Sequence, residues 1–552
     1  MVGREEPGRL IGRVGGRWWW MMTMALSVAE GWHWRQRVMR RRCGGDVYAR
    51  SSHYHQFFLL MDFLFILFFI TTLALTVYKL RLIKPIKKNL PPSPPGALPI
   101  IGHLRLVLSA TPFHRTLQAI SSNSTQYADY MLLKLGVRNV IVLSSPHAVE
   151  ECIHKNDVAF ANRPHSIAFD YYSYNYSQIS MTDYGPHWRN LRRLTATNIF
   201  SSTSLHASSD VRHDAVRCLL RDLYKSTTNI GAPRKIDLKL KFFELTFNSI
   251  MSMLTGQPIG EGLCHTKGNN WFFDVLRGAK VKKSLAASSK NRDAYFEEMI
   301  ERYRSNCLAK KKPKSILDVL LSLQQEHPEQ YNHVIIKGII LAMFIGAADT
   351  TTMTLEWAMS LLLNNPETLQ KALNELDHNI EPHCLLEDSN LSNLPYIQSI
   401  IQETLRLFPP APFLFPHASA SECKVDQYDV PSGTIIVANA WAIHRDPKLW
   451  SEPNKFMPER FMQLQSLGQG NINNKFKFIP FGIGRRGCPG DGLAMHTITL
   501  ALGSVLRCFE WEKIGDEPID TSEGVQFLLP KAKALEALCK PRSEMLNVLC
   551  QI

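Results

Sequence analysis

The sequence predicts a mainly α-helical protein with small β-sheets, an α+β fold class. Helical patterns dominate the chain, and the longest covers residues 333–364. Only short runs favour strands, at residues 140–143 (VIVL) and near 435–437 (IIV). The chain has no internal repeat and no GxGxxG motif after a strand, which indicates one large body without a dinucleotide-binding domain.

The composition is that of a globular protein with a large core. Of the 552 residues, 45% are hydrophobic and 20% are charged. The eleven cysteines lack a repeating spacing, which favours a reducing compartment over a disulfide framework. The net charge of +14 suits nucleic acid or an acidic membrane surface. Because the chain carries no nucleic-acid motif, we expect membrane lipid as a partner and no nucleic acid.

Residues 1–60 differ from the rest of the chain. They hold ten arginines, no lysine and four acidic residues, which gives a net charge of +6. A transit peptide is one interpretation, since such peptides are rich in arginine and poor in acidic residues. Glu5, Glu6 and three consecutive tryptophans fit that interpretation badly. We favour an upstream extension with no fold of its own.

Residues 61–82 predict a transmembrane anchor. Met61 is a natural start, and residues 63–78 contain no charged side chain. With Leu80 and Leu82, the apolar segment approaches the ~20 residues that cross a bilayer. The basic residues that follow indicate a cytosolic flank: Lys79, Arg81, Lys84, Lys87 and Lys88. A cleaved signal peptide is the alternative, but no small-residue cleavage site follows.

Residues 83–99 form a basic and proline-rich hinge. The run at residues 91–96 (PPSPPG) predicts a stiff, extended spacer between the anchor and the globular body. The body then covers residues 100–545. If it is cytosolic, the three sequons at Asn123, Asn175 and Asn390 carry no glycan.

A single cysteine in a glycine-rich turn carries the strongest chemical signal. Cys488 lies within residues 481–490 (FGIGRRGCPG), before a helix-like run whose start favours a thiolate. Pro489 suits the first position of that helix. Cys488 has no CxxC partner or nearby histidine, so it does not predict a zinc site, which needs about four ligands. It can supply the axial thiolate of a haem iron, and a buried structural cysteine is the alternative.

The order Phe481, Gly484, Arg486, Cys488, Gly490 resembles the haem-binding signature of cytochrome P450 monooxygenases. The resemblance implies the cytochrome P450 fold behind an N-terminal membrane anchor, with haem b as the cofactor. It makes Cys488 the axial ligand of the iron. Further cofactor-binding residues would be Phe481, Gly482 and Gly490 in the turn, with Arg486 and His417 by resemblance.

Trp188 and Arg192 lie four residues apart, which on a helix places both on one face. An arginine can hold a carboxylate through two hydrogen bonds, and haem carries two propionates. A solvated basic face with one anchoring tryptophan gives the same pattern. The resemblance favours propionate binding by both residues.

The long helix over 333–364 contains the run Gly346-Ala347-Ala348-Asp349-Thr350-Thr351. Three adjacent threonines follow Asp349 and suit a helix interior poorly, and a threonine hydroxyl can divert a backbone hydrogen bond. The run resembles the oxygen-activation motif AGxDTT, in which Asp349 delivers protons and Thr350 positions them. It departs from that motif where Ala347 replaces a glycine. A core helix with small residues at a crossing is the alternative.

Glu403 and Arg406 lie three residues apart, a spacing that is common on exposed helices and means little alone. Arg460 follows in residues 456–461 (FMPERF). The resemblance implies that one carboxylate is held by both arginines in a buried network. We expect this network to be structural and to hold the core behind the cysteine turn.

Finer features resemble the plant group that includes isoflavone 2'- and 3'-hydroxylases, among them residues 162–164 (NRP), 354–360 (TLEWAMS) and 439–447 (NAWAIHRDP). This resemblance implies hydroxylation of an apolar, aromatic, flavonoid-like plant metabolite. Electrons would come from NADPH through NADPH-cytochrome P450 reductase, for which Arg485 and Arg486 offer a basic docking face. The resemblance further implies a single-pass endoplasmic-reticulum protein with a cytosolic catalytic domain. Expected substrate contacts are Phe344, Ala348, Phe413, Phe527 and the segment from Tyr171 to Tyr176.

One departure from the plant group lies before Trp271. After Gly256 the chain reaches Trp271 quickly, so the helices that roof the substrate pocket look shortened. A shorter roof admits water, which works against productive chemistry. Three hypotheses remain: a working monooxygenase with an altered roof, an inactive haem-binding relative, and a defective gene product. An oxygen-independent isomerase or dehydratase of the same fold is a further rival, which the retained Asp349-Thr350 pair disfavours.

Overall fold

The computed structural model describes residues 61, 63–72, 75, 89–107, 112–227, 233–256, 282–307, 315–466, 476–524 and 527–552. The chain divides into two units, Met1–Lys87 and Lys88–Ile552. In the first unit, Phe63–Thr72 is a ten-residue apolar helix with exposed side chains. The rest of the predicted anchor, the extension over residues 1–60 and the segment before Trp271 lie outside the described residues.

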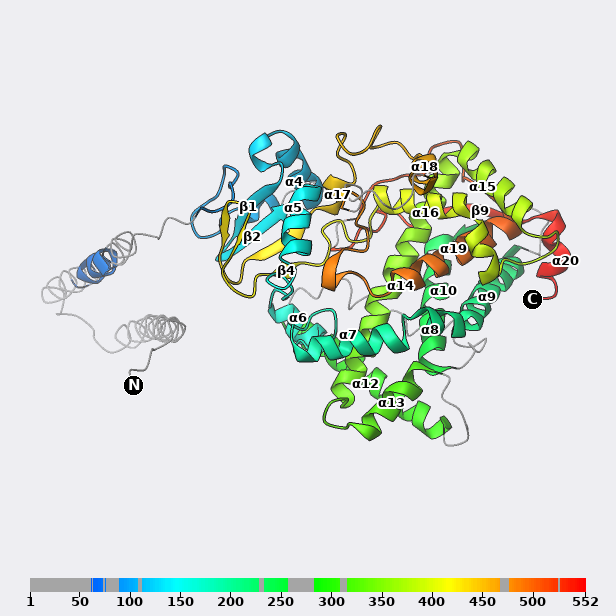
Figure 1. The fold of residues 1–552 in the computed structure, drawn as a ribbon, viewed down its shortest axis with the longest axis horizontal. Helices are drawn as coiled ribbons and strands as arrows, with labels where there is room; N and C mark the ends of the chain where they lie inside the picture. Colours follow the sequence, from blue (N-terminus) through cyan, green and yellow to red (C-terminus); the bar gives the residue numbers. More distant parts are fainter. Residues whose placement is uncertain are drawn as a thin grey trace, which may run out of the picture. The chain divides into compact units, whose positions relative to one another are not determined.

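The second unit is mainly helical, as the sequence predicts (Figure 1). Its α-helices are α3 Leu104–Val107, α4 Phe113–Ser122, α5 Pro146–Val149, α6 Ile167–Tyr172, α7 Pro186–Asn198, α8 Ser202–Ala207, α9 Ser209–Thr227, α10 Leu238–Thr255, α12 Lys282–Cys307, α13 Ile316–Glu326, α14 His333–Asn364, α15 Pro366–Asn379, α16 Pro395–Leu407, α17 Ala440–Ile443, α18 Glu459–Ser466, α19 Asp491–Cys508 and α20 Leu546–Leu549. Shorter 3-10 helices cover Thr125–Tyr127, Asp388–Asn393, Gly484–Arg486 and Ser543–Met545, and a π-helix covers Glu150–Lys155.

In the part of the chain that the structure describes, three small sheets accompany the helices. Their strands are β1 Tyr130–Leu135, β2 Arg138–Leu143, β3 Arg234–Asp237, β4 His417–Ala418, β5 Cys423–Val425, β6 Tyr428–Val430, β7 Ile435–Ala438, β8 Phe509–Glu512 and β9 Glu536–Pro541. The sheets have the orders β1-β2-β7-β4, β3-β9-β8 and β5-β6. The two strands that the sequence predicts, β2 and β7, pair directly and in parallel, with Val140 opposite Ile435.

Helix α14 has the bounds that the sequence predicts and runs through the middle of the helical part (Figure 1). It begins after Asn332, whose side chain accepts a hydrogen bond from the N–H of Ile335. The helix is long and apolar enough to cross a membrane, but 61% of its most apolar window is buried within the protein. It is therefore the central core helix.

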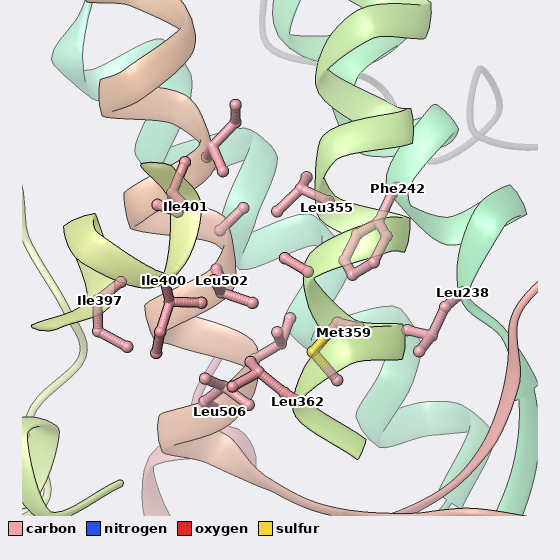
Figure 2. Close-up of a cluster of buried hydrophobic side chains, with 14 of the residues drawn as sticks. Leu238, Phe242, Leu355, Met359, Leu362, Ile397, Ile400, Ile401, Leu502 and Leu506 are labelled. Carbon is pink, nitrogen blue, oxygen red and sulfur yellow. The ribbon is translucent and has the colours of Figure 1, made fainter. Parts of the chain in front are cut away.

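The largest core joins α14 to α10, α16 and α19. Figure 2 shows Leu355, Met359 and Leu362 of α14 between Leu238 and Phe242 of α10 on one side and residues of α16 and α19 on the other: Ile397, Ile400, Ile401, Leu502 and Leu506. Helix α19 follows directly on the cysteine turn, so this core supports the turn from behind. The helix begins at Asp491 with Gly490 as its N-cap, so Pro489 lies before it and not at its first position.

Candidate active site

The turn that carries Cys488 is held by backbone hydrogen bonds and by glycines in the left-handed region. The N–H of Cys488 donates to the carbonyl O of Phe481 at 2.8 Å. Gly482 and Gly484 have φ values of +69° and +70°. A Cβ at Gly484 would lie 2.6 Å from the carbonyl O of Ile153, at the end of the π-helix. The turn therefore needs glycine at position 484 for both backbone conformation and space.

The Cys488 side chain is exposed by surface area, yet burial raises the pKa of its thiol. The two observations agree if protein surrounds the sulfur on most sides and leaves it open on one. Asp491 raises this pKa further, whereas the N–H of Gly490 and the positive charge of Arg192 lower it. The thiol thus faces an open space with groups beside it that stabilise a thiolate.

Helix α7 brings Trp188 and Arg192 to the cysteine turn. Nη1 of Arg192 donates a 2.9 Å hydrogen bond to the carbonyl O of Gly487, the residue before Cys488. Trp188 is buried, and the guanidinium of Arg486 lies 4.7 Å from the centre of its ring. The structure therefore brings together four residues that the sequence predicts for one site.

Arg486 and His417 turn inward and bond to backbone carbonyls. Arg486 donates to the carbonyl O atoms of Ala161, Ile179 and Thr182, and burial lowers its pKa to about 10. His417 on β4 is bonded through Nδ1 to the carbonyl O of Phe160 at 2.8 Å. Burial, with the charges of Arg163 and Arg486 nearby, lowers the pKa of His417 to about 3. Arg486 is therefore not part of the basic docking face we expected, and Arg485 is paired with Asp157 at 2.9 Å.

Arg163 is a further buried cation that we did not predict. It donates to the carbonyl O atoms of Ser180, Phe415 and Pro416, and burial with Arg486 nearby lowers its pKa to about 9. The only sequence signal for Arg163 was its place in the run Asn162-Arg163-Pro164, which we used as a marker of the plant group.

Positive charge at this site exceeds the negative charge that faces it. Within the described residues, Arg163, Arg192 and Arg486 form no ion pair with a carboxylate, and the hydrogen bonds of their guanidinium groups go to backbone carbonyls. Asp183 gives partial compensation, because it accepts from the backbone N–H of Arg163 and raises the pKa of Arg486. Buried cations without a partner are costly, so the site suits a bound group with carboxylates. A thiol and several cations fit haem, with its iron and two propionates.

An accessible stripe interrupts the buried surface of α14. Ala342, Ile345, Gly346, Ala347 and Thr350 keep surface area, whereas most of the helix is buried. A Cβ at Gly346 would meet no atom within 4 Å. The other described residues therefore leave this stripe uncovered, which suits a helix that lies beside a flat ligand and a substrate.

Asp349 and Thr350 lie beside each other but differ in environment. Thr350 is on the stripe, and its Oγ1 donates to the carbonyl O of Gly346 at 2.7 Å, one turn back. Asp349 is buried at 7% exposure, and burial raises its pKa from 3.8 to about 6. A carboxyl with this pKa exchanges protons readily near neutral pH, which is the property of a general acid or base.

The sequence profile of the cytochrome P450 family matches residues 91–535. The chain belongs to the cytochrome P450 family. It is 44% identical over 489 residues to cytochrome P450 81Q32 of Catharanthus roseus, a match that covers 84% of this chain and 94% of the relative. It is 40% identical to a (+)-piperitol/(+)-sesamin synthase of Sesamum radiatum over 84% of this chain and 93% of the relative. It is 39% identical to an isoflavone 2'-hydroxylase of Glycyrrhiza echinata, a match that covers 84% of this chain and 94% of the relative.

Comparison with solved structures also indicates the cytochrome P450 fold. A zebra fish cytochrome P450 solved with progesterone superposes with a TM-score of 0.68 at 24% sequence identity, over 78% of this chain and 100% of the other. The protein is thus a cytochrome P450 monooxygenase that resembles the plant group of the isoflavone hydroxylases. Membership of this family implies haem as the cofactor.

The expected network of this cytochrome P450 is formed in full. Arg406 donates to both oxygens of Glu403 at 2.7 Å, and Nε of Arg460 donates to Glu403 Oε1 at 3.0 Å. Glu403 and Arg406 are completely buried. Nη1 of Arg406 also donates to the carbonyl O of His444, whose Nε2 accepts from the N–H of Ile479. His444, which we did not predict, connects the network to the chain just before Phe481.

Two of the expected substrate contacts of this cytochrome P450, Phe344 and Ala348, lie away from the accessible stripe. Phe344 and Ala348 are buried on the opposite side of α14, where Phe344 packs 5.2 Å from Phe247, ring centre to ring centre. Phe413 packs against Phe113 at 5.4 Å, and Phe527 is exposed and touches the edge of Phe415. Ala342, Ile345 and Gly346 of the same helix keep accessible surface, whereas Phe344 and Ala348 do not.

The segment from Tyr171 to Tyr176 is anchored to α12. Nη2 of Arg292, which is buried, donates to the carbonyl O of Tyr171 at 2.9 Å. Tyr174, Asn175 and Tyr176 all have positive φ, between 50° and 60°. Three consecutive residues in the left-handed region store strain, which is common at ligand-binding segments.

Proposed function

We propose that this cytochrome P450 is a membrane-anchored haem-thiolate enzyme that hydroxylates an apolar, aromatic, flavonoid-like plant metabolite. It uses O2 and electrons that NADPH-cytochrome P450 reductase supplies. The observation that carries the proposal is the excess of buried cations beside the Cys488 thiol. Haem satisfies the cations with its two propionates and the thiol with its iron.

Each predicted cofactor residue has a role in this proposal. Cys488 would ligate the haem iron, in a cradle that includes Phe481, Gly482 and Gly490. Arg192, Arg486, Arg163 and His417 would hold the propionates, and Trp188 would fix the position of Arg486 by lying against its guanidinium. Haem bound there supplies the activation of O2.

The long helix supplies protons and part of the substrate surface. Asp349 holds a proton that it passes inward, and the hydroxyl of Thr350 orients it at the accessible stripe. The stripe is apolar apart from Thr350, which suits a substrate with few polar groups. The relatives named for isoflavone hydroxylation and for sesamin synthesis support an aromatic plant metabolite as the substrate class.

The domain arrangement is part of the proposal. Residues 61–82 anchor the protein in the endoplasmic-reticulum membrane, residues 83–99 are the hinge, and residues 100–545 form the cytosolic catalytic domain. The exposed apolar helix at Phe63–Thr72 supports the anchor. Carbonate extraction of membranes tests it, with the full chain compared with a chain that starts at Met61 and with one that starts at Lys88.

Two measurements test the function in sequence. A reduced carbon-monoxide difference spectrum must give the Soret band of a haem thiolate, and its absence would refute the role of Cys488. NADPH-dependent conversion of a flavonoid panel with a plant reductase must then yield hydroxylated products. A correct spectrum without any product would favour the inactive haem-binding relative, and conversion without NADPH would favour the isomerase or dehydratase.

A further inference from the structure

Three side chains of the kinds that bind metal ions meet between the π-helix and the β5–β6 hairpin. His147 lies on α5, Glu151 lies on the π-helix Glu150–Lys155 that follows it, and Asp426 lies in the turn between β5 and β6. Each offers one nitrogen or oxygen atom, and the three atoms all lie within 4.8 Å of one another. The proposed function uses none of the three.

Local structure places these residues, the metal triad, from two directions. His147 and Glu151 are four residues apart in one continuous helical run, a spacing that makes side chains neighbours. Ser145 starts that run, because its side chain accepts from the N–H of Ala148. Asp426 follows the last residue of β5 and has a φ of +49°, in the left-handed region that aspartate adopts more readily than most residues.

Asp426 is oriented by a buried hydroxyl. Its Oδ2 accepts a 2.6 Å hydrogen bond from the O–H of Tyr130 on β1, which is 6% exposed. The same Oδ2 lies 3.1 Å from Nε2 of His147. Carboxylates that bind metals are themselves hydrogen-bonded by a residue behind them, which fixes their direction. Tyr130 holds Asp426 in this way.

Negative charge around the triad exceeds the positive charge. Glu150 and Glu151 share Lys155, whose Nζ lies 3.7 and 2.5 Å from their oxygens. Within the described residues, Asp426 forms no ion pair with a lysine or an arginine, and its ionic partner is His147. Three carboxylates and one ammonium therefore leave two negative charges beside a neutral imidazole, in a chain whose net charge is +14. A divalent cation would balance them.

We propose that His147, Glu151 and Asp426 bind one divalent transition-metal ion, for which Zn²⁺ is the best fit. The imidazole favours zinc over Mg²⁺ and Ca²⁺, which take oxygen ligands. Three protein ligands and one water molecule complete a tetrahedral zinc site. Bonds of about 2.0–2.2 Å place tetrahedral ligand atoms about 3.4 Å apart. Small rotations of the three side chains reach that spacing from the present one.

The expected role of the ion is structural and does not depend on the proposed function. Zinc at the triad joins the π-helix to the β5–β6 hairpin. The π-helix contains Ile153, whose carbonyl O lies against Gly484 of the cysteine turn. The hairpin binds Asn89 of the hinge, because the N–H of Asp429 donates to the carbonyl O of Asn89 at 2.7 Å. The ion would therefore connect the element beside the turn with the element that holds the hinge.

Calorimetric titration of the full chain with Zn²⁺, after dialysis against EDTA, tests the site. Wild type should bind one ion that His147→Ala and Asp426→Asn each weaken by tenfold or more. Weak sites at exposed cysteines are the same in all variants, so the difference between titrations isolates the triad. Equal affinity in wild type and His147→Ala would overturn the proposal and leave a surface ion pair only.

The matched control is His165→Ala. Nε2 of His165 also lies 3.1 Å from an aspartate oxygen, Oδ2 of Asp183, and its side chain is also exposed. In the part of the chain that the structure describes, this pair belongs to no group of three metal ligands. The variant should bind Zn²⁺ as wild type does. Equal loss in His165→Ala and His147→Ala would assign binding to surface histidines in general and overturn the triad.

Two further measurements identify the ligands. Tyr130→Phe removes the hydrogen bond behind Asp426 and should weaken Zn²⁺ binding about tenfold. Unchanged affinity would contradict an Asp426 ligand held by this bond. X-ray absorption at the zinc edge, with one equivalent of Zn²⁺, should show only nitrogen and oxygen ligands at about 2.0–2.2 Å. A sulfur ligand at about 2.3 Å would assign the ion to a cysteine and overturn the proposal.

Melting curves separate loss of the site from loss of the fold. With EDTA present, His147→Ala should melt at the wild-type temperature, because His147 is exposed and its pair with Asp426 lies at the surface. Zn²⁺ should raise the melting temperature of wild type and of His165→Ala, since a ligand of the folded state stabilises it. It should leave His147→Ala unchanged. A rise of equal size in His147→Ala would contradict the triad.

Discussion

The backbone N–H of Ile479 donates a 3.0 Å hydrogen bond to Nε2 of His444, and this bond joins the buried arginine network to the cysteine turn. The carbonyl O of the same histidine accepts from Arg406. Burial and the charges of Arg406 and Arg445 lower the pKa of His444 to about 3, so the ring is neutral and Nε2 acts as an acceptor. The turn therefore depends on an imidazole 44 residues upstream of Cys488.

We predict that His444→Ala leaves the N–H of Ile479 buried without a partner. The loss should lower the free energy of unfolding by about 1–3 kcal/mol and speed the loss of haem from the turn. Urea denaturation and haem transfer to apomyoglobin measure the two effects. His147→Ala is the control, because His147 is exposed and paired only at the surface. Equal haem loss from both variants would show that the bond does not hold the turn.

Gly484→Ala should disturb the cysteine turn through sterics. The left-handed backbone alone costs about 1–2 kcal/mol for alanine, and the new Cβ would also meet the carbonyl O of Ile153 at 2.6 Å. We expect a lower melting temperature and little haem-thiolate signal in the carbon-monoxide spectrum.

Gly136→Ala separates the two contributions. Gly136 has φ +61°, close to that of Gly484, but a Cβ there would meet no atom within 4 Å. The Gly136→Ala variant should lose only the stability that the left-handed backbone costs, and it should keep the haem-thiolate band in the carbon-monoxide spectrum. If both variants lose the same stability, the contact with Ile153 has no effect.

Local sequence was sufficient to predict the elements that carry Cys488 and Asp349, whereas the role of Glu403 came from the family resemblance. Each of these residues belongs to a motif within one helix or turn, and the long helix has the expected bounds. Arg163 and His444 were missed because their partners are remote. The groups that Arg163 bonds through its guanidinium include carbonyls about 250 residues downstream. No spacing rule within a helix or strand connects such positions.

The accessible face of α14 was also not predictable. The helix is apolar nearly all round, so its hydrophobic pattern does not distinguish the core side from the accessible side. Phe344 was expected to contact substrate, but it lies on the core side, where it packs with Phe247 and Phe296. Small residues such as Gly346 leave the space that a ligand needs.

Glu403→Gln should be among the most destabilising single changes in this chain. It removes one charge from a buried network and leaves Arg406 and Arg460 without a counter-charge, which costs about 3–5 kcal/mol. Chemical denaturation measures the loss. Glu298→Gln, in the exposed pair with Arg302, should change stability little. A small effect of Glu403→Gln would mean that both arginines find new acceptors among the nearby carbonyls.

His417 should make the protein sensitive to acid. Its pKa falls from 6.5 to about 3 on folding, so the unfolded chain binds more protons between these values. Its contribution to stability is complete above pH 6.5 and is lost as the pH falls toward 3. The haem-free His417→Asn variant should take up about one proton fewer on unfolding near pH 5. The pH dependence of the urea midpoint reports this number.

Asp349→Asn should raise stability and lower turnover together. The pKa of Asp349 rises from 3.8 to about 6 on folding, so the folded chain holds the proton more tightly. The wild type therefore loses stability as the pH rises from about 4 through 6, and the variant avoids that loss. The variant should gain up to about 3 kcal/mol at pH 8 relative to pH 4. Turnover should fall by about 10²-fold or more, since asparagine cannot supply a proton.

Asp388→Asn provides a control of opposite sign. Asp388 is paired with Arg212 and His213, and its pKa falls to about 2 on folding, so its stabilising effect is present above about pH 4 and is lost in acid. Its variant should be less stable than wild type at pH 8 and should keep turnover per bound haem. A loss of both stability and turnover in Asp349→Asn would assign Asp349 a packing role, because only a proton donor gives more stability with less activity.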